Sequence, residues 1–264
     1  MTATEFRFTE GAAYERFMGP WTRAVGAVFL DWLAIPEKQR WLDVGCGTGV
    51  FTELILEKAA PSEIVAIDPA AAQILYAREK PVAARANFRI ADAASLPFDD
   101  ASFDVVVSAL ALNFIPEREK AVAEMRRVAQ RGGGCVAGYV WDLCGPLAAT
   151  RHVANVLREM EAKVAPIPGV NSTRLEALGS LFEQAGLAEV TLRTIEVELT
   201  YPDFEAYWRR FIENPTPASL FVRDLPPDGQ EIFREKLSAS LPAAPDGTIT
   251  FAARGNAVKG VAPA

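Results

Sequence analysis

The chain has few of the residues that build metal centres and disulfide frameworks. Its 264 residues include one histidine, His152, and three cysteines, Cys46, Cys135 and Cys144. The cysteines are odd in number and show no C-x-x-C spacing, so we expect neither a disulfide framework nor a metal site. Unpaired thiols are typical of a reducing compartment, and we expect a cytoplasmic protein.

Basic residues and long apolar runs are also scarce. Lys and Arg number 27 against 34 Asp and Glu, which gives a net charge of −7. Tight nonspecific binding to nucleic acid relies on a surplus of cations, so we expect no nucleic-acid partner. No apolar run is long enough to span a bilayer, and the polar amino-terminal segment lacks a signal-peptide pattern. We therefore expect no membrane partner, and the sequence does not indicate an oligomeric state.

The most informative segment is a short apolar strand followed directly by a glycine-rich turn. It runs from Trp41 to Gly49, Trp-Leu-Asp-Val-Gly-Cys-Gly-Thr-Gly, and a helical pattern of apolar residues begins at Val50. Glycines let the backbone bend sharply and let a ligand approach without a Cβ in the way. The following helix offers free N–H groups and the positive end of its dipole. The segment predicts a nucleotide-type pocket.

The spacing of this turn distinguishes between two kinds of nucleotide. Dinucleotide-binding turns follow G-x-G-x-x-G and hold a pyrophosphate at the helix N-terminus. Here the spacing is G-x-G-x-G, and Asp43 precedes the first glycine by two residues. A carboxylate at that position repels a pyrophosphate but attracts a ligand with a cationic amine. An NAD(P)-dependent oxidoreductase is therefore the weaker alternative.

The segment resembles the first motif of class I S-adenosylmethionine-dependent methyltransferases. Their cofactor has an α-ammonium, a sulfonium and an adenosine, and no phosphate. The resemblance implies S-adenosylmethionine as cofactor and S-adenosylhomocysteine as product. It places cofactor contacts on Asp43, Gly45, Cys46, Gly47 and Gly49.

Two further acids stand at the ends of the next predicted strands. The strand over 62–68 ends on Asp68, which is placed to accept hydrogen bonds from both ribose hydroxyls, and the adjacent Pro69 is a further candidate cofactor contact. Asp68 before Pro69 also suits a helix N-cap with proline at the first helical position, and both roles can hold together. After the third strand, the resemblance implies that Asp92 accepts from the adenine amino group and that the Ala93 N–H meets a ring nitrogen. The alternative for Asp92 is a turn former.

The fourth strand and the amino-terminal segment complete the predicted cofactor site. Residues 103–110 form an apolar run, and its end is expected beside the cofactor at Ala109, Leu110 and Phe114. The segment 14–21, Tyr-Glu-Arg-Phe-Met-Gly-Pro-Trp, resembles the amino-terminal segment of the methyltransferase type 11 group, which often folds over the cofactor. The resemblance implies contacts from Tyr14, Arg16, Met18 and Trp21. The alternative is an amphipathic helix that packs on the sheet.

Strands and helices alternate through residues 41–140, which predicts an α/β fold with a doubly wound parallel sheet. The resemblance implies a mostly parallel, Rossmann-like sheet of seven strands within a single domain, 1–264. The last strands are expected at 187–199 and at 249–261, the latter split at 254–256. Segments 143–170 and 201–245 are predicted to be helical cap insertions that set substrate specificity.

The expected reaction is methyl transfer to a small-molecule acceptor, whose identity the sequence does not reveal. A base is needed only if the acceptor must lose a proton, and the candidates are His152 and Tyr139. The competing interpretation is a protein that keeps this fold and the cofactor pocket without catalysis. Methyl transfer needs few catalytic side chains, so the sequence offers little to separate the two.

Overall fold

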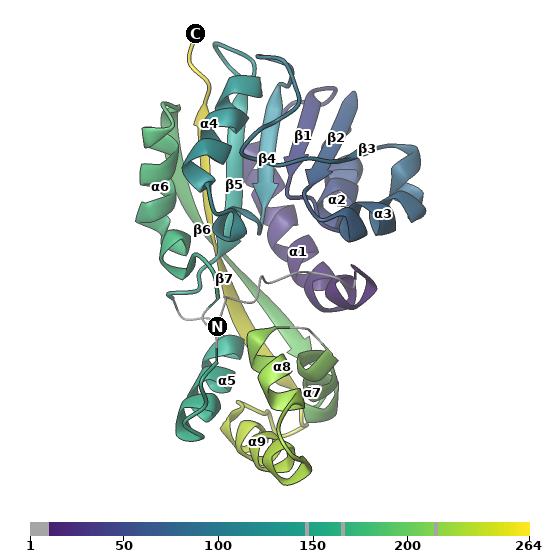
Figure 1. The fold of residues 1–264 in the computed structure, drawn as a ribbon, viewed down its shortest axis with the longest axis vertical. Helices are drawn as coiled ribbons and strands as arrows, with labels where there is room; N and C mark the ends of the chain where they lie inside the picture. The colour runs from purple at the N-terminus through teal and green to yellow at the C-terminus, as the bar shows by residue number, and fades with distance from the viewer. Residues whose placement is uncertain (1–10, 146–147, 165–166, 214–215) are drawn as a thin grey trace.

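The structure, a computed structural model, describes residues 11–145, 148–164, 167–213 and 216–264 (Figure 1). Within these ranges it describes the backbone alone for residues 11–14, 16–17 and 148–150. The predicted roles of Tyr14 and Arg16 therefore lie outside the described side chains.

One sheet of seven strands organises the fold, with the order β3-β2-β1-β4-β5-β7-β6. Strands β1 to β5 are mutually parallel, while β7 runs antiparallel to both β5 and β6. The predicted doubly wound, mostly parallel sheet is confirmed. The bounds are β1 Arg40–Val44, β2 Glu63–Asp68, β3 Asn87–Ile90, β4 Val105–Ala109, β5 Cys135–Trp141, β6 Ala188–Tyr201 and β7 Ile249–Val261.

Helices cover both faces of the parallel part, so its central strands are nearly continuous apolar runs. One face carries α1 Gly11–Leu33, α2 Val50–Lys58 and α3 Ala71–Glu79, and the other carries α4 Arg118–Val128 and α6 Leu175–Gln184 (Figure 1). Short 3-10 turns, η1 Pro81–Ala84, η2 Leu112–Phe114 and η3 Val170–Thr173, lie in the connections. Because parallel strands end at one edge, this arrangement gathers the turns after β1, β2, β3 and β4 together.

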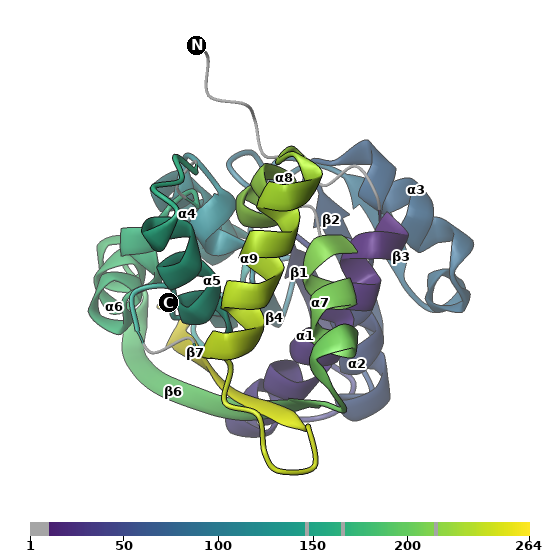
Figure 2. The ribbon, with the colours of Figure 1, turned by 90° about the horizontal axis from the view of Figure 1, so that it is seen from below.

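The strands β6 and β7 continue beyond the sheet as a two-stranded ribbon that carries four helices. These are α5 Ala148–Glu159, α7 Phe204–Glu213, α8 Pro217–Arg223 and α9 Pro227–Ser240. They lie beyond the carboxyl-terminal ends of the parallel strands, which is the direction of the β4 arrow, as Figures 1 and 2 show. Their apolar faces share one buried cluster, which includes Val156, Phe211, Phe233 and Phe251. We call these four helices the helical cap.

Three predictions about local structure are wrong. Strand β7 is not split at 254–256, because Gly255 pairs with Trp141 on one side and with Ile195 on the other. The sequence predicts a proline-rich loop at 215–217, but Pro217 is the first residue of helix α8, which Thr216 caps. Asp68 is not a helix N-cap, since α3 begins at Ala71 with Ala70 as its N-cap.

Candidate functional site

The glycine turn after β1 adopts a backbone that side chains would block. Gly45, Gly47 and Gly49 all have positive φ, at 78°, 53° and 80°. A Cβ on Gly45 would stand 2.4 Å from the Cβ of Ala111, closer than real contacts allow. The N–H groups of Gly45 and Cys46 donate to the carbonyl of Ile67 at 2.8 and 2.9 Å. The turn is therefore fixed against the end of β2.

Asp43 lies directly beneath this turn and is fully buried. Its Oδ2 accepts a hydrogen bond from Thr52 Oγ1 at 2.7 Å, while its Oδ1 has no hydrogen-bond partner among the described residues. Burial raises the pKa of Asp43 from 3.8 to about 7, against the lowering effect of the Thr52 bond, and the charge of Asp68 adds to the rise. A buried carboxylate oxygen without a donor is costly to folding, which points to a ligand that donates to it.

Asp68 ends β2 and holds the turn through its backbone. Its Oδ2 accepts from the Gly47 N–H at 3.0 Å, and its Oδ1 accepts from the Ala70 N–H at 2.8 Å. Burial raises the pKa of Asp68, and these two hydrogen bonds lower it. Each oxygen keeps a further lone pair, so a ligand hydroxyl can still donate to this carboxylate.

The third predicted acid, Asp92, sits at the surface. Its Oδ1 accepts from the Ala94 N–H at 2.9 Å, the bond of a turn-forming aspartate, while Ala93 is buried. Pro69 is exposed beside Asp68. The structure thus gives Asp92 the local role that its alternative predicted. An adenine contact there remains a prediction.

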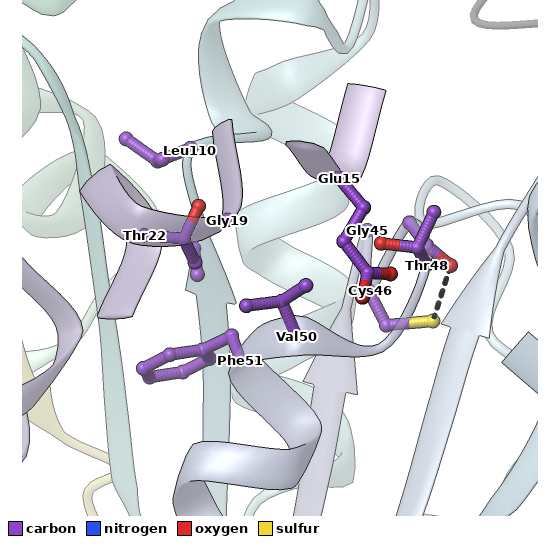
Figure 3. A pocket seen from close by; sticks show the side chains of 11 residues that line it. Glu15, Gly19, Thr22, Gly45, Cys46, Thr48, Val50, Phe51 and Leu110 are labelled. Atoms are coloured by element: carbon purple, nitrogen blue, oxygen red, sulfur yellow. Dashed lines mark hydrogen bonds between the residues drawn. The ribbon is translucent and has the colours of Figure 1, made fainter. Parts of the chain in front are cut away.

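A cavity of about 40 Å³ lies between the glycine turn, the end of β4 and helix α1 (Figure 3). Five of the predicted residues line it, namely Gly45, Cys46, Gly47, Ala109 and Leu110. Leu110 reaches it with a positive φ of 57°, and its N–H donates to the Tyr139 carbonyl at 2.8 Å. The structure therefore brings the first motif and the end of β4 together.

Helix α1 contributes lining residues that the sequence interpretation missed. Glu15, Gly19 and Thr22 face the cavity, at positions i, i+4 and i+7 of the helix. That spacing is a visible signal, because residues so spaced share one face of a helix. The amino-terminal segment was expected to offer Tyr14, Arg16, Met18 and Trp21 instead.

Met18 and Trp21 lie away from this cavity lining. Met18 is half-buried and packs against both the α1 side of the sheet and the helical cap. Trp21 is buried, and its ring meets the edge of Trp141 at 5.7 Å between centroids. Phe114 ends η2, outside the cavity lining. Met18 and Trp21 thus join α1 to the surrounding structure.

The two predicted bases are also outside the cavity. Tyr139 is fully buried, with its ring 4.8 Å from that of Phe29, and its hydroxyl donates to the Thr22 carbonyl at 3.4 Å. A phenol enclosed in the core has no path to an acceptor. His152 lies on α5 in the helical cap, with its ring 6.2 Å from that of Phe251. Neither position supports a base role.

Neither a cluster of metal ligands nor a membrane-spanning helix is present in the described part of the chain. Across those residues, no group of three or more His, Cys, Asp or Glu side chains is placed to hold a metal ion. None of the described helices has the length and apolarity needed to cross a membrane.

The sheet order, the glycine turn and the acids at the ends of β1 and β2 define a Rossmann-like protein with a nucleoside site. Comparison with known proteins identifies its kind. Residues 42–137 match the family model described as a methyltransferase domain. The chain is 30% identical over 172 residues to a demethylmenaquinone methyltransferase of Renibacterium salmoninarum, covering 64% of this chain and 70% of that protein.

Two further similar proteins are also named as methyltransferases. A ubiquinone/menaquinone biosynthesis C-methyltransferase of Dinoroseobacter shibae is 36% identical over 108 residues, 39% of this chain and 43% of that protein. The match thus spans less than half of that relative's length. A phosphoethanolamine N-methyltransferase of Haemonchus contortus, solved with S-adenosyl-L-methionine, shares the fold with a TM-score of 0.61 and 17% identity, over 99% of this chain and 58% of that one.

The chain belongs to the class I S-adenosylmethionine-dependent methyltransferases. Within that class it falls in the methyltransferase type 11 group. The residues present suit the cofactor of this class. Asp43 Oδ1 lacks a donor that an ammonium would supply, and the positive-φ glycines leave room for a nucleoside. The dinucleotide alternative is wrong, as the G-x-G-x-G spacing indicated.

Proposed function

We propose that this protein transfers a methyl group from S-adenosylmethionine to a small-molecule acceptor. The observation that carries the proposal is the buried Oδ1 of Asp43 beneath the glycine turn, which has no partner in the part of the chain that the structure describes. A carboxylate in that position gains most from a ligand with a cationic donor, because a charge-assisted hydrogen bond is stronger than a neutral one.

Each predicted cofactor residue has a role in this proposal. Asp43 accepts from the α-ammonium, and Asp68 accepts from the ribose hydroxyls with the oxygens that already hold Gly47 and Ala70. Asp92 and the Ala93 N–H meet the adenine. The positive-φ turn and the small side chain of Ala109 give the ligand access to the backbone. Tyr14 and Arg16 stay candidates for the carboxylate of the cofactor.

When bound, the cofactor supplies an activated methyl group on a sulfonium. The chain then has to bring an acceptor close and in line, and to exclude water. We assign no general base, since Tyr139 is enclosed in the core and His152 packs in the helical cap. Orientation by the turn, by η2 and by the cap is the protein's contribution.

We propose that the acceptor binds between the sheet and the helical cap, which covers most of the predicted insertions 143–170 and 201–245 of a single domain. The cap lies past the edge at which open α/β sheets bind ligands (Figure 1). Its buried cluster is rich in aromatic and aliphatic side chains. The named acceptors of the relatives, a demethylmenaquinone and a phosphoethanolamine, are small molecules.

The net charge of −7 disfavours a nucleic-acid acceptor, and three unpaired cysteines support a cytoplasmic location.

The test has two stages. Calorimetry first measures binding of S-adenosylmethionine, S-adenosylhomocysteine and NAD, with the exposed-site variant Asp99→Asn as a matched control for Asp43→Asn. Saturable binding of the first two that is much weaker in Asp43→Asn supports the site. Incubation with a panel of quinols, carboxylic acids and amines then follows S-adenosylhomocysteine by mass spectrometry. Binding without product formation across the panel would favour a cofactor-binding protein that lacks catalysis.

A further inference from the structure

One charged side chain, that of Glu15, stands among the described residues that line the cavity at the glycine turn. The other described lining residues include no Asp, Glu, Lys, Arg or His. Its side chain extends from α1 toward the turn at Cys46 and Thr48 (Figure 3). The Glu15 side chain is 27% exposed, so water screens its charge only partly. Glu15 is outside the first motif and no predicted role falls on it.

Lys80 neutralises part of this charge from outside the lining. Its Nζ lies 3.0 and 2.9 Å from the two carboxylate oxygens of Glu15, and it also donates to the Thr48 carbonyl at 3.3 Å. Lys80 directly follows α3, and its side chain is 15% exposed. The Glu15–Lys80 pair therefore joins α1 to the glycine turn and to the end of α3.

The enclosed cavity is smaller than a nucleoside ligand. Pockets for ligands of that size have volumes of about 300 Å³ or more, against about 40 Å³ here. A nucleoside therefore extends beyond this cavity or displaces part of its lining. Pro20 lies inside α1 directly after Gly19, and a proline removes one helical hydrogen bond, so the segment before it can move with less restraint.

We propose that Glu15 is a selectivity residue that favours the charged cofactor over its uncharged product. The inference rests on the proposed function. Methyl transfer converts a sulfonium into a thioether, so S-adenosylmethionine has one positive charge more than S-adenosylhomocysteine. A carboxylate at the cavity stabilises the first relative to the second, and the ammonium of Lys80 opposes this preference. The carboxylates of Asp43 and Asp68, on the other side of the turn, also favour the charged cofactor. Their contribution is the same in the wild type and in a Glu15 variant.

This charge effect differs from a purely mechanical role of the ion pair. A contact that only holds α1 over the cavity changes the affinity for both ligands by the same factor when it is broken. The electrostatic role changes their ratio instead. It also makes the two partners behave oppositely, because one is an anion and the other is a cation.

The experiment measures the ratio of the two dissociation constants, S-adenosylhomocysteine over S-adenosylmethionine, by calorimetry at low ionic strength. We expect Glu15→Gln to lower this ratio by about three- to tenfold and Lys80→Met to raise it by a similar factor. The matched control is Glu79→Gln, which removes an exposed carboxylate next to Lys80, outside the lining. It should change the ratio by less than about twofold, because an exposed charge is screened by solvent.

An unchanged ratio in Glu15→Gln, or a shift of the same sign in both variants, would overturn the inference. If Glu15→Gln does not fold by circular dichroism, the sign of the Lys80→Met shift decides, together with the salt dependence of the wild-type ratio. Rising salt should lower that ratio, and a flat response counts against the proposal. If the wild type binds neither ligand, the proposed function itself fails, which is a separate result.

Discussion

The substitution Asp43→Asn should stabilise the cofactor-free protein at neutral and alkaline pH. Burial raises the pKa of Asp43 from 3.8 to about 7. Between these two values the native state keeps a proton that the unfolded chain has lost, so stability falls as the pH rises through this window. Above pH 7 the full penalty of about 4 kcal/mol is present, since one pKa unit corresponds to about 1.4 kcal/mol.

Asparagine removes the charge and keeps an oxygen that can accept from Thr52 Oγ1. It also places an amide N–H₂ where Oδ1 has no partner, which costs about 1–3 kcal/mol. We therefore expect a net gain of about 1–3 kcal/mol in the free energy of unfolding at pH 8. The difference between variant and wild type should grow by about 2–3 kcal/mol from pH 5 to pH 8, whatever the amide costs.

Urea unfolding at several pH values between 5 and 8 measures this difference directly. Asp99→Asn is the control, because Asp99 is exposed and its substitution should leave stability nearly unchanged at each pH. A difference between Asp43→Asn and wild type that stays constant from pH 5 to pH 8 would refute the argument. It would show that Asp43 has a pKa near its usual value in the folded protein and that burial does not raise this pKa.

Three other substitutions test the site in simpler ways. Asp68→Ala should weaken S-adenosylmethionine binding by about 1–3 kcal/mol, because ribose hydrogen bonds are lost, and unchanged affinity by calorimetry would remove Asp68 from the site. Gly45→Ala should lower the melting temperature and abolish binding, because the new Cβ stands 2.4 Å from that of Ala111 at a φ of 78°. His152→Ala should keep methyl-transfer rates within about twofold once an acceptor is known, and a loss of about a hundredfold or more would restore His152 as a base.

The strand, glycine turn and helix could be predicted from the sequence because every signal there is local. Burial on both faces gives β1 its apolar residues, and positive φ at the turn requires glycine. The acid at the end of β2 was found for the same reason, since Asp68 closes a continuous apolar run. The mostly parallel, seven-stranded sheet followed from the resemblance and from the alternation of strands and helices, which leaves few topologies open.

The helical cap and the lining from α1 depend on contacts between distant parts of the chain. Gly255 looked like a break in the last strand, but pairing on both sides keeps it extended. Pro217 looked like a loop residue, although proline at the first helical position together with a threonine cap is a helix start. The lining role of Glu15 needs the position of α1 over the turn, which no local pattern specifies. Tyr139 was misjudged because a strand end can be enclosed by a helix that precedes it in the chain.

The affinity for S-adenosylmethionine should itself depend on pH, and Asp43 sets the sign. A cationic amine binds the ionised carboxylate, and the pKa of Asp43 is about 7 before the ligand arrives. Below that value the ligand must displace a proton, so the dissociation constant should rise by about tenfold for each pH unit lost, down to pH 5.5. The pKa of Asp68 is also raised, so its protonation weakens binding at low pH as well. The pH dependence therefore has to be measured for both the wild type and Asp43→Asn. In that variant we expect weak binding with a much shallower slope between pH 5.5 and pH 7. An equally steep slope in both proteins would assign the titration to Asp68 or to another group, and would separate the buried acid of β1 from cofactor recognition.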